Sequence, residues 1–129
     1  MTTKPKTHRL GDLQLKLMKV LWEQREAAVA DIHDLIEPET GLAFTTVATM
    51  LRKMEGRGLV THRAEGRKFL YRAAVAEADV TRNMADDLLD KLFEGSLAQM
   101  VSHLLTTHEV SEDELSKLED LIAERKSKK

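Results

Sequence analysis

Apolar residues recur at three- and four-residue steps along the first part of the chain, and this spacing predicts amphipathic helices. A first helix is expected over about residues 12–24, with Asp12 as its N-cap. A second should begin at Asp31 and end before Pro38, because proline disfavours a helical conformation in the residue before it. The residues expected to face inward are Leu13, Leu17, Met18, Leu21 and Trp22 in the first helix and Ile32, Leu35 and Ile36 in the second.

A third helix is expected over about residues 45–56, after a loop that contains Gly41. Thr45 can cap its start, and the run Gly56-Arg57-Gly58 can end it in a left-handed conformation. Its apolar stripe consists of Val47, Met50, Leu51 and Met54. The opposite face would then expose Thr45, Thr46, Thr49, Arg52 and Lys53 to solvent.

Two β-prone runs follow the third helix, over residues 59–64 and 68–73, and they flank Glu65-Gly66. Glycine tolerates the positive φ of a tight hairpin, so these runs predict two antiparallel strands. Phe69 and Tyr71 alternate along the second run, and we expect them to pack on one face. A very short strand is also expected at 27–29. Three helices followed by a hairpin predict a winged helix-turn-helix.

The rest of the chain repeats the helical spacing and predicts three further helices. One spans about residues 77–94, a second carries the run from Leu97 to Leu105, and Ser111 with Glu114 starts the last as a capping box. So small a helical unit rarely buries its own apolar surface, and we therefore expect it to dimerise. The candidate dimerisation residues are Leu88, Leu92, Phe93, Leu97, Met100, Val101, Leu104, Leu105, Leu118, Leu121 and Ile122. The alternative is that these helices pack on their own winged domain.

The distribution of charge also divides the chain at about residue 74, between the predicted hairpin and the predicted C-terminal helices. The 129 residues carry a net charge of −2, and 42% of them are hydrophobic, which is enough for a core. Residues 1–74 hold 13 Lys and Arg against 9 Asp and Glu, a net of +4, whereas residues 75–129 hold 7 against 13, a net of −6. Within residues 44–72 the count is 7 against 2. A basic module joined to an acidic one concentrates positive potential on one part of the molecule and favours a polyanion there.

The residue types on the third helix also suit DNA. Threonine hydroxyls and methyls fit base edges and phosphates in a major groove that admits one helix, and arginine can bind guanine or phosphate through two parallel hydrogen bonds. The predicted hairpin at residues 59–73, which forms the wing of this fold, would add cations near its tip. The candidate DNA-binding residues are Thr45, Thr46, Thr49, Arg52, Lys53, Arg63, Arg67 and Lys68. The expected fold is mainly α with a small β-hairpin: a winged helix-turn-helix DNA-binding domain at 1–74 and a three-helix dimerisation domain at 75–129.

Several other classes of function are disfavoured. The chain has no cysteine, no phosphate-binding glycine loop, no recognisable Ser/His/Asp arrangement and no HExxH helix, so we expect no enzymatic activity. His103 and His108 are five residues apart, not the four that align two metal ligands on one helix face, and we expect no metal or cofactor. Residues 1–9 predict neither a signal peptide nor a membrane span, which favours a cytoplasmic protein. They form either an unstructured tail or an arm that contacts phosphates.

Four segments in order resemble the penicillinase repressors of bacteria. They are LQLKLMKVLW at 13–22, FTTVATMLRKMEGRGLV at 44–60, EGRKFLY at 65–71 and FEGSLAQMVSHLL at 93–105. That family consists of dimeric winged-helix proteins that repress β-lactamase and related resistance genes, with copper-responsive repressors as a branch. The resemblance implies that the third helix reads half-sites in promoters through Thr45, Thr46 and Thr49, with Arg52 close by and Arg67 at the wing.

The resemblance also bears on how repression would be relieved. Antibiotic-linked members are cut by a protease, triggered by a membrane sensor, just after the segment that resembles residues 96–101 here. The matching bond is His103–Leu104, where those members carry an Asn-Phe pair, so this chain departs from the cleavage pattern. The copper branch carries a C-terminal cysteine cluster, and the absence of cysteine here excludes copper sensing through thiolates.

Residues and resemblance together predict a homodimeric, sequence-specific transcriptional repressor that binds a pseudopalindromic operator. Proteolysis in the dimerisation domain, by an inducing protease or sensor partner, is one expected route of release. Two alternatives stay open: control by a small-molecule ligand at the dimer interface, and a winged-helix module that binds a protein partner without DNA. The basic face of the third helix favours the DNA interpretation over the last of these.

Overall fold

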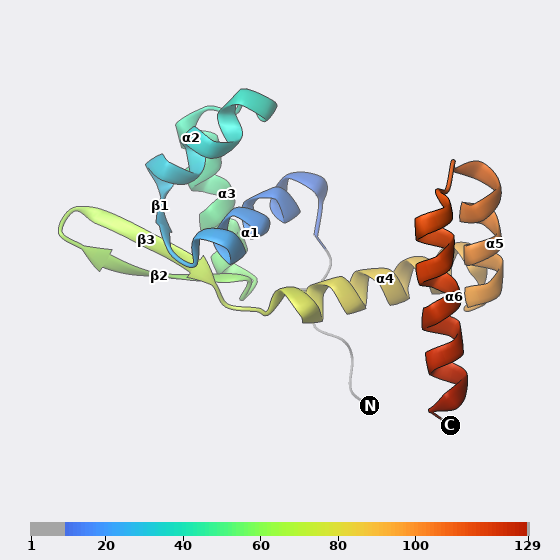
Figure 1. Ribbon diagram of the computed structural model, residues 1–129. Coiled ribbons are helices and arrows are strands. Elements are labelled where there is room, and N and C mark those ends of the chain that lie inside the picture. The colour runs from blue at the N-terminus through green and yellow to red at the C-terminus, as the bar shows by residue number, and fades with distance from the viewer. Residues whose placement is uncertain (1–9, 129) are drawn as a thin grey trace. The chain divides into compact units, whose positions relative to one another are not determined.

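The computed structural model describes residues 10–128, and residues 1–9, with both interpretations of that tail, lie outside them (Figure 1). The elements in order are α1 (Asp12–Gln24), β1 (Ala27–Ala28), α2 (Val29–Thr40), α3 (Phe44–Gly56), β2 (Val60–Glu65), β3 (Lys68–Ala73), α4 (Glu77–Phe93), α5 (Leu97–Thr107) and α6 (Glu112–Ser127). The predicted fold class, mainly α with a small hairpin, is confirmed. Among the described helices, none combines the length and apolar character needed to cross a membrane.

The described chain forms two compact units that divide within α4, between Asp86 and Asp87. The composition changes earlier, at about residue 74. The difference arises because the connection into α4 and its first turns pack with the first unit. The indole Nε1 of Trp22 donates to the Val75 carbonyl at 2.9 Å, and Val80 is buried.

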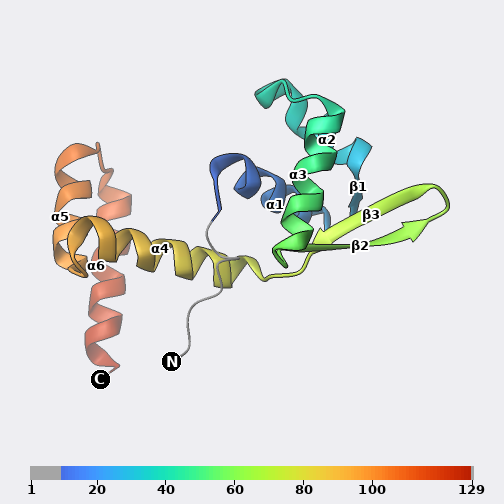
Figure 2. The same ribbon diagram turned by 180° about the vertical axis from the view of Figure 1, so that it is seen from behind.

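The core of the first unit lies between the three helices and the sheet. The inward stripes of α1, α2 and α3 meet there, as the helical spacing predicted. The sheet is antiparallel with strand order β1-β3-β2, in which Ala27 pairs with Tyr71 and His62 pairs with Tyr71 from the other side. Figure 2 shows α3 running down to the start of β2. The buried core residues are Leu17, Met18, Leu21, Ala27, Ile32, Ile36, Val47, Leu51, Met54, Leu59, Val60 and Tyr71.

The second helix is longer than predicted, because Pro38 lies inside it rather than beyond its end. The missing proline N–H gives up one helical hydrogen bond, but two others carry the helix through its last turn. The Thr40 hydroxyl donates to the Ile36 carbonyl at 2.9 Å, and the Gly41 N–H donates to the Glu37 carbonyl at 2.8 Å. Gly41 then ends the helix in a left-handed conformation with φ of 66°.

Helix starts and turn positions differ from the predictions by one or two residues. The N-cap of α1 is Gly11, not Asp12, and that of α3 is Ala43, so Thr45 lies inside the first turn. The hairpin turns at Gly66-Arg67 instead of Glu65-Gly66, with Gly66 at φ of 65°. The turn of a two-residue hairpin sets which residues of its two strands pair, so a shift of the turn by one residue changes the pairing of β2 with β3.

Two leucines expected to face the core do not. Leu35 on α2 is 53% exposed, and Leu13 on α1 is also exposed. Both lie at the edge of an apolar stripe, where helical spacing alone does not tell whether a neighbouring element covers the side chain.

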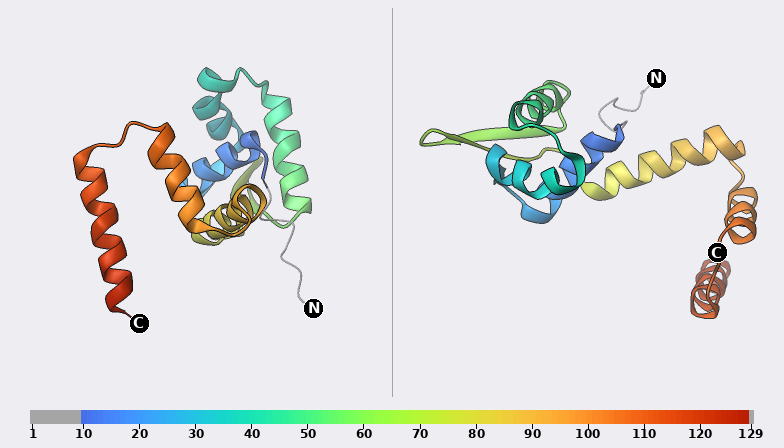
Figure 3. Two further views of the ribbon diagram at one scale, coloured as in Figure 1. Left: turned by 90° about the vertical axis from the view of Figure 1, so that its right-hand side faces the viewer. Right: turned by 90° about the horizontal axis from the view of Figure 1, so that it is seen from above.

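The second unit has almost no interior of its own. Its last two helices, α5 and α6, follow one another across a short loop (Figure 3). Neither of them contains a buried residue. Both helices begin with a serine N-cap: Ser96 Oγ accepts from the Gln99 N–H and Ser111 Oγ from the Glu114 N–H, each at 3.1 Å. The predicted N-cap role of Ser111, one half of the expected capping box, is therefore confirmed. Helices that form locally but bury nothing leave their apolar faces open for another surface.

Candidate nucleic-acid interface

The outer face of α3 is built as the helical spacing predicted. Val47, Leu51 and Met54 anchor the inner side in the core with no exposed surface. The opposite side exposes all five predicted residues, Thr45, Thr46, Thr49, Arg52 and Lys53. The Arg52 Nη2 donates to the Thr49 hydroxyl at 3.4 Å, which lays the guanidinium along this face. The structure thus brings three hydroxyls and two cations together on one exposed helix surface.

The turn before α3 is fixed by side chains. His33 Nε2 lies 2.9 Å from the Leu42 carbonyl oxygen, and the Leu42 N–H donates to the Thr40 hydroxyl at 3.2 Å. The first turn of α3 itself has no side-chain cap and no acidic residue. Its positive dipole end is therefore not neutralised by a neighbouring carboxylate of that turn, which suits an approaching phosphate.

The end of α3 sets where the wing begins. Gly58 adopts φ of 81°, the Gly58 N–H donates to the Glu55 carbonyl, and the Leu59 N–H donates to the Met54 carbonyl, both at 3.0 Å. These two bonds define a Schellman motif, in which the contact between Met54 and Leu59 is buried. The motif turns the chain sharply from α3 into β2.

An aromatic cluster on the wing includes His62, whose imidazole also contacts α3. The His62 ring lies 4.4 Å from the Phe69 ring and 5.2 Å from the Tyr71 ring, centroid to centroid. His62 Nδ1 also lies 2.8 and 2.9 Å from the two carboxylate oxygens of Glu55 on α3. Burial, and next the Glu55 carboxylate, raise the pKa of the Tyr71 phenol. The predicted packing is therefore observed for Tyr71, which is buried, whereas Phe69 is 51% exposed and contacts the His62 ring.

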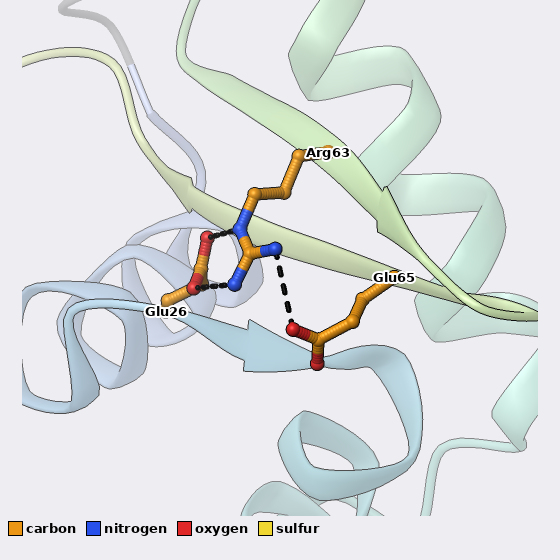
Figure 4. Close-up of polar contacts among 3 residues, drawn as sticks. All are labelled: Glu26, Arg63 and Glu65. Carbon is orange, nitrogen blue, oxygen red and sulfur yellow. Dashed lines mark hydrogen bonds and ion pairs between the residues drawn. The ribbon is translucent and has the colours of Figure 1, made fainter.

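The wing cations do not behave alike. Arg67 lies in the hairpin turn and Lys68 starts β3, and both are exposed. Arg63 instead forms a two-bond ion pair with Glu26, Nε to Oε2 at 2.8 Å and Nη2 to Oε1 at 2.9 Å, and a longer contact to Glu65 at 3.4 Å (Figure 4). The hydrogen bond from Arg63 lowers the pKa of the Glu26 carboxyl. The Glu26 carboxylate therefore balances the charge of Arg63, which the sequence analysis placed among the candidate DNA-binding residues.

Sequence reasoning also missed Glu55 and His62. Both lie in the segment singled out for DNA binding, but no local spacing rule pairs a helix residue with a strand residue. The available signal was the presence of an acidic residue, Glu55, on the helix of a predominantly basic segment. Within residues 10–128, no three His, Asp or Glu side chains gather closely enough to hold a metal ion.

The candidate dimerisation residues lie on α4, α5 and α6, and most of them are exposed in the single chain. Leu88, Leu92, Leu97, Leu104, Leu105, Leu121 and Ile122 are among the exposed large apolar residues, while Phe93, Met100, Val101 and Leu118 are half-buried. The candidate cleavage bond His103–Leu104 lies in the middle of α5. His103 is exposed, and its ring lies 5.7 Å from that of Phe93. Phe93, Ala98, Gln99, Ser102 and His103 line an open hollow of about 440 Å³.

Three helices, a hairpin and an exposed third-helix face define the winged helix-turn-helix class, here followed by a helical unit. The model of the penicillinase repressor family matches residues 10–124, and the chain belongs to this family. It is 26% identical to the penicillinase repressor of Bacillus licheniformis, covering 96% of this chain and 97% of that protein. It is 29% identical to the transcriptional regulator BlaI of Mycobacterium tuberculosis, over 92% and 86% respectively.

A solved structure supports the same assignment for the first unit. The solution structure of the DNA-binding domain of the repressor BlaI is similar to this chain with a TM-score of 0.51 and 26% identity. The similarity covers 61% of this chain and 93% of that one. The predicted family resemblance is thus confirmed.

Proposed function

We propose that this protein is a sequence-specific DNA-binding transcriptional repressor that acts as a homodimer on a pseudopalindromic operator. The observation that carries the proposal is the exposed face of α3, where Thr45, Thr46, Thr49, Arg52 and Lys53 stand opposite a fully buried inner side. Membership of the penicillinase repressor family supports it. A relative whose solved domain is called DNA-binding has the fold of the first unit.

In this proposal α3 lies in the major groove and the hairpin tip reaches the neighbouring backbone. Thr45, Thr46 and Thr49 contact base edges and phosphates, and Arg52 and Lys53 bind guanine or phosphate. The wing residues Arg67 and Lys68 contact phosphate and so contribute affinity for any sequence. Arg63 has no direct DNA contact in this proposal, because its guanidinium is engaged by Glu26.

The second unit supports the dimerisation in this proposal. Its helices leave several large apolar side chains uncovered, and a second copy of the chain offers an equal surface in return. A two-fold dimer would read two half-sites about one helical turn of DNA, or a multiple of it, apart. A monomer would lose the tethering of the two readers, which is a factor of roughly 10² to 10⁴ in affinity.

Release of the operator would then follow from loss of the dimer. A cut at His103–Leu104, by an inducing protease or one activated by a sensor protein, would divide α5 and leave α3 intact. The second candidate for release is a small ligand, for which the hollow beside Phe93 and His103 is the relevant observation. A repressor of this kind acts in the cytoplasm with its promoter and requires no catalytic chemistry.

The test is a titration of the purified protein against a fluorescent duplex from upstream of its own gene and against random duplex, at two salt concentrations. We expect at least about 10³-fold preference for the upstream duplex, with two subunits per site. Preference for neither duplex, with binding that vanishes as salt rises, would contradict sequence-specific repression. No binding even at low salt would favour the protein-interaction module instead.

A further inference from the structure

Glu55 occupies an unfavourable place for a carboxylate. It lies in the last turn of α3, where the negative end of the helix dipole repels an anion. It also stands in a predominantly basic part of the chain, residues 44–72, next to the proposed DNA-binding face. A carboxylate there would repel phosphate and compete with it for nearby cations. Its presence therefore calls for a partner that holds the charge.

His62 is that partner. An ionised carboxylate only accepts hydrogen bonds, so the contacts of 2.8 and 2.9 Å to both Glu55 oxygens require the proton to be on His62 Nδ1. The Phe69 and Tyr71 rings pack against the imidazole and fix its orientation. The Glu55 carboxylate is thereby turned toward the wing.

Arg52 is the other natural partner of Glu55. Residues three apart on a helix are surface neighbours, and opposite charges at that spacing attract each other. Both charges act on Tyr71, whose pKa Glu55 raises and Arg52 lowers, so the two side chains share one neighbourhood. Yet within residues 10–128 no ion pair joins them, and Arg52 donates to Thr49 on the outer face instead.

We propose that His62 is a positioning residue of the DNA interface: by holding Glu55, it keeps the Arg52 guanidinium on the outer face of α3 for phosphate or guanine. This inference rests on the proposed DNA-binding function. Without His62, Glu55 rotates toward Arg52 and neutralises a cation that the DNA needs. The defect then comes from a pairing that forms, and not only from packing that is lost.

The experiment compares operator binding of the full-length protein with that of four variants: His62→Ala, His62→Asn, Glu55→Gln and the double variant that combines His62→Ala with Glu55→Gln. We expect His62→Ala to weaken binding about tenfold per half-site, the worth of one charge-assisted hydrogen bond. Glu55→Gln in that background should restore binding to the level of Glu55→Gln alone. His62→Asn should bind as the wild type does, because its amide can donate to Glu55 from a similar position.

Circular dichroism melts check that each variant is folded, and the Arg52 guanidinium NMR resonance in the free protein gives a readout without DNA. That resonance should shift in His62→Ala and return in the double variant. An equal gain from Glu55→Gln with and without His62 would overturn the inference, because it would reflect only removal of a negative charge. If the wild type shows no operator preference, the proposed function fails. The Arg52 resonance still tests whether Glu55 pairs with Arg52 when His62 is absent, and an unshifted resonance in His62→Ala would contradict that pairing.

Discussion

Leu92 provides a direct test of the proposed dimer surface. It lies on α4 in the second unit and is 65% exposed in the single chain. A leucine open to this extent is covered by a partner if the second unit dimerises through its apolar faces. Leu92→Ala removes most of that apolar area without adding charge and keeps a good helix former in the helix.

The expected size of the effect follows from the exposed area. Full burial of a leucine side chain stabilises by about 1.5–3 kcal/mol, so covering the open two-thirds of Leu92 contributes roughly 1–2 kcal/mol per copy. A two-fold interface contains the position twice, which gives roughly 2–4 kcal/mol per dimer. We therefore expect the dissociation constant of the dimer to rise about 30-fold or more, at 1.4 kcal/mol per factor of ten.

Sedimentation equilibrium measures this constant directly. The matched control is Leu35→Ala on α2, since Leu35 is 53% exposed but belongs to the first unit. The control should dimerise like the wild type, and circular dichroism should show equal helix content in all three proteins. An unchanged constant for Leu92→Ala, or an equal rise for Leu35→Ala, would refute the assignment of this surface to the dimer.

Three further predictions concern the first unit. Arg67→Ala should weaken binding to every DNA sequence and flatten the salt slope, whereas Thr46→Ala should reduce discrimination between operator and random duplex; equal losses for both variants on both duplexes would contradict this division. Gly58→Ala should lower the free energy of unfolding by about 1–2 kcal/mol in denaturant melts, because an L-residue is strained at φ of 81°. Gly56→Ala, whose added Cβ meets no atom within 4 Å, should leave the free energy of unfolding unchanged or raise it. The pKa of Glu26 is lowered, so its ion pair stabilises the fold above the ordinary pKa of 4.5, and this stabilisation is lost as pH falls through the folded pKa. Glu26→Gln should therefore reduce the loss of stability at acid pH, measured by denaturant melts. An unchanged pH dependence would argue against the ion pair in solution.

The local patterns in the sequence predicted the elements well. Each predicted helix and both hairpin strands are present, because helical and alternating spacing reports which face an element turns to the core. The predictions failed at positions where contacts beyond the local pattern set the end of a helix or the burial of a side chain. Pro38 remains helical because Thr40 and Gly41 complete the turn after it, and Leu35 is exposed because no neighbouring element within residues 10–128 covers it.

The exposure of the candidate residues on α3 could be predicted from the sequence, but the ion pair of Arg63 in the wing could not. The five candidate residues of α3 are exposed because they share a single helical face, which the sequence specifies. Arg63 pairs with Glu26, a residue 37 positions earlier that the hairpin brings close only in three dimensions. Charge counting treats both as independent ions, so it could not tell the engaged arginine from the exposed Arg67.

The single helix α4 has a consequence for how the protein unfolds. Its turns up to Asp86 belong to the first unit and those from Asp87 to the second, with no break in the hydrogen-bond ladder between them. Helix formation is cooperative, so fraying that starts in the second unit propagates along the ladder until tertiary packing around Val80 stops it. Amide hydrogen exchange should therefore change gradually along α4, with the slowest amides near Val80. Damage to the second unit would reach the first as local unfolding along one continuous backbone.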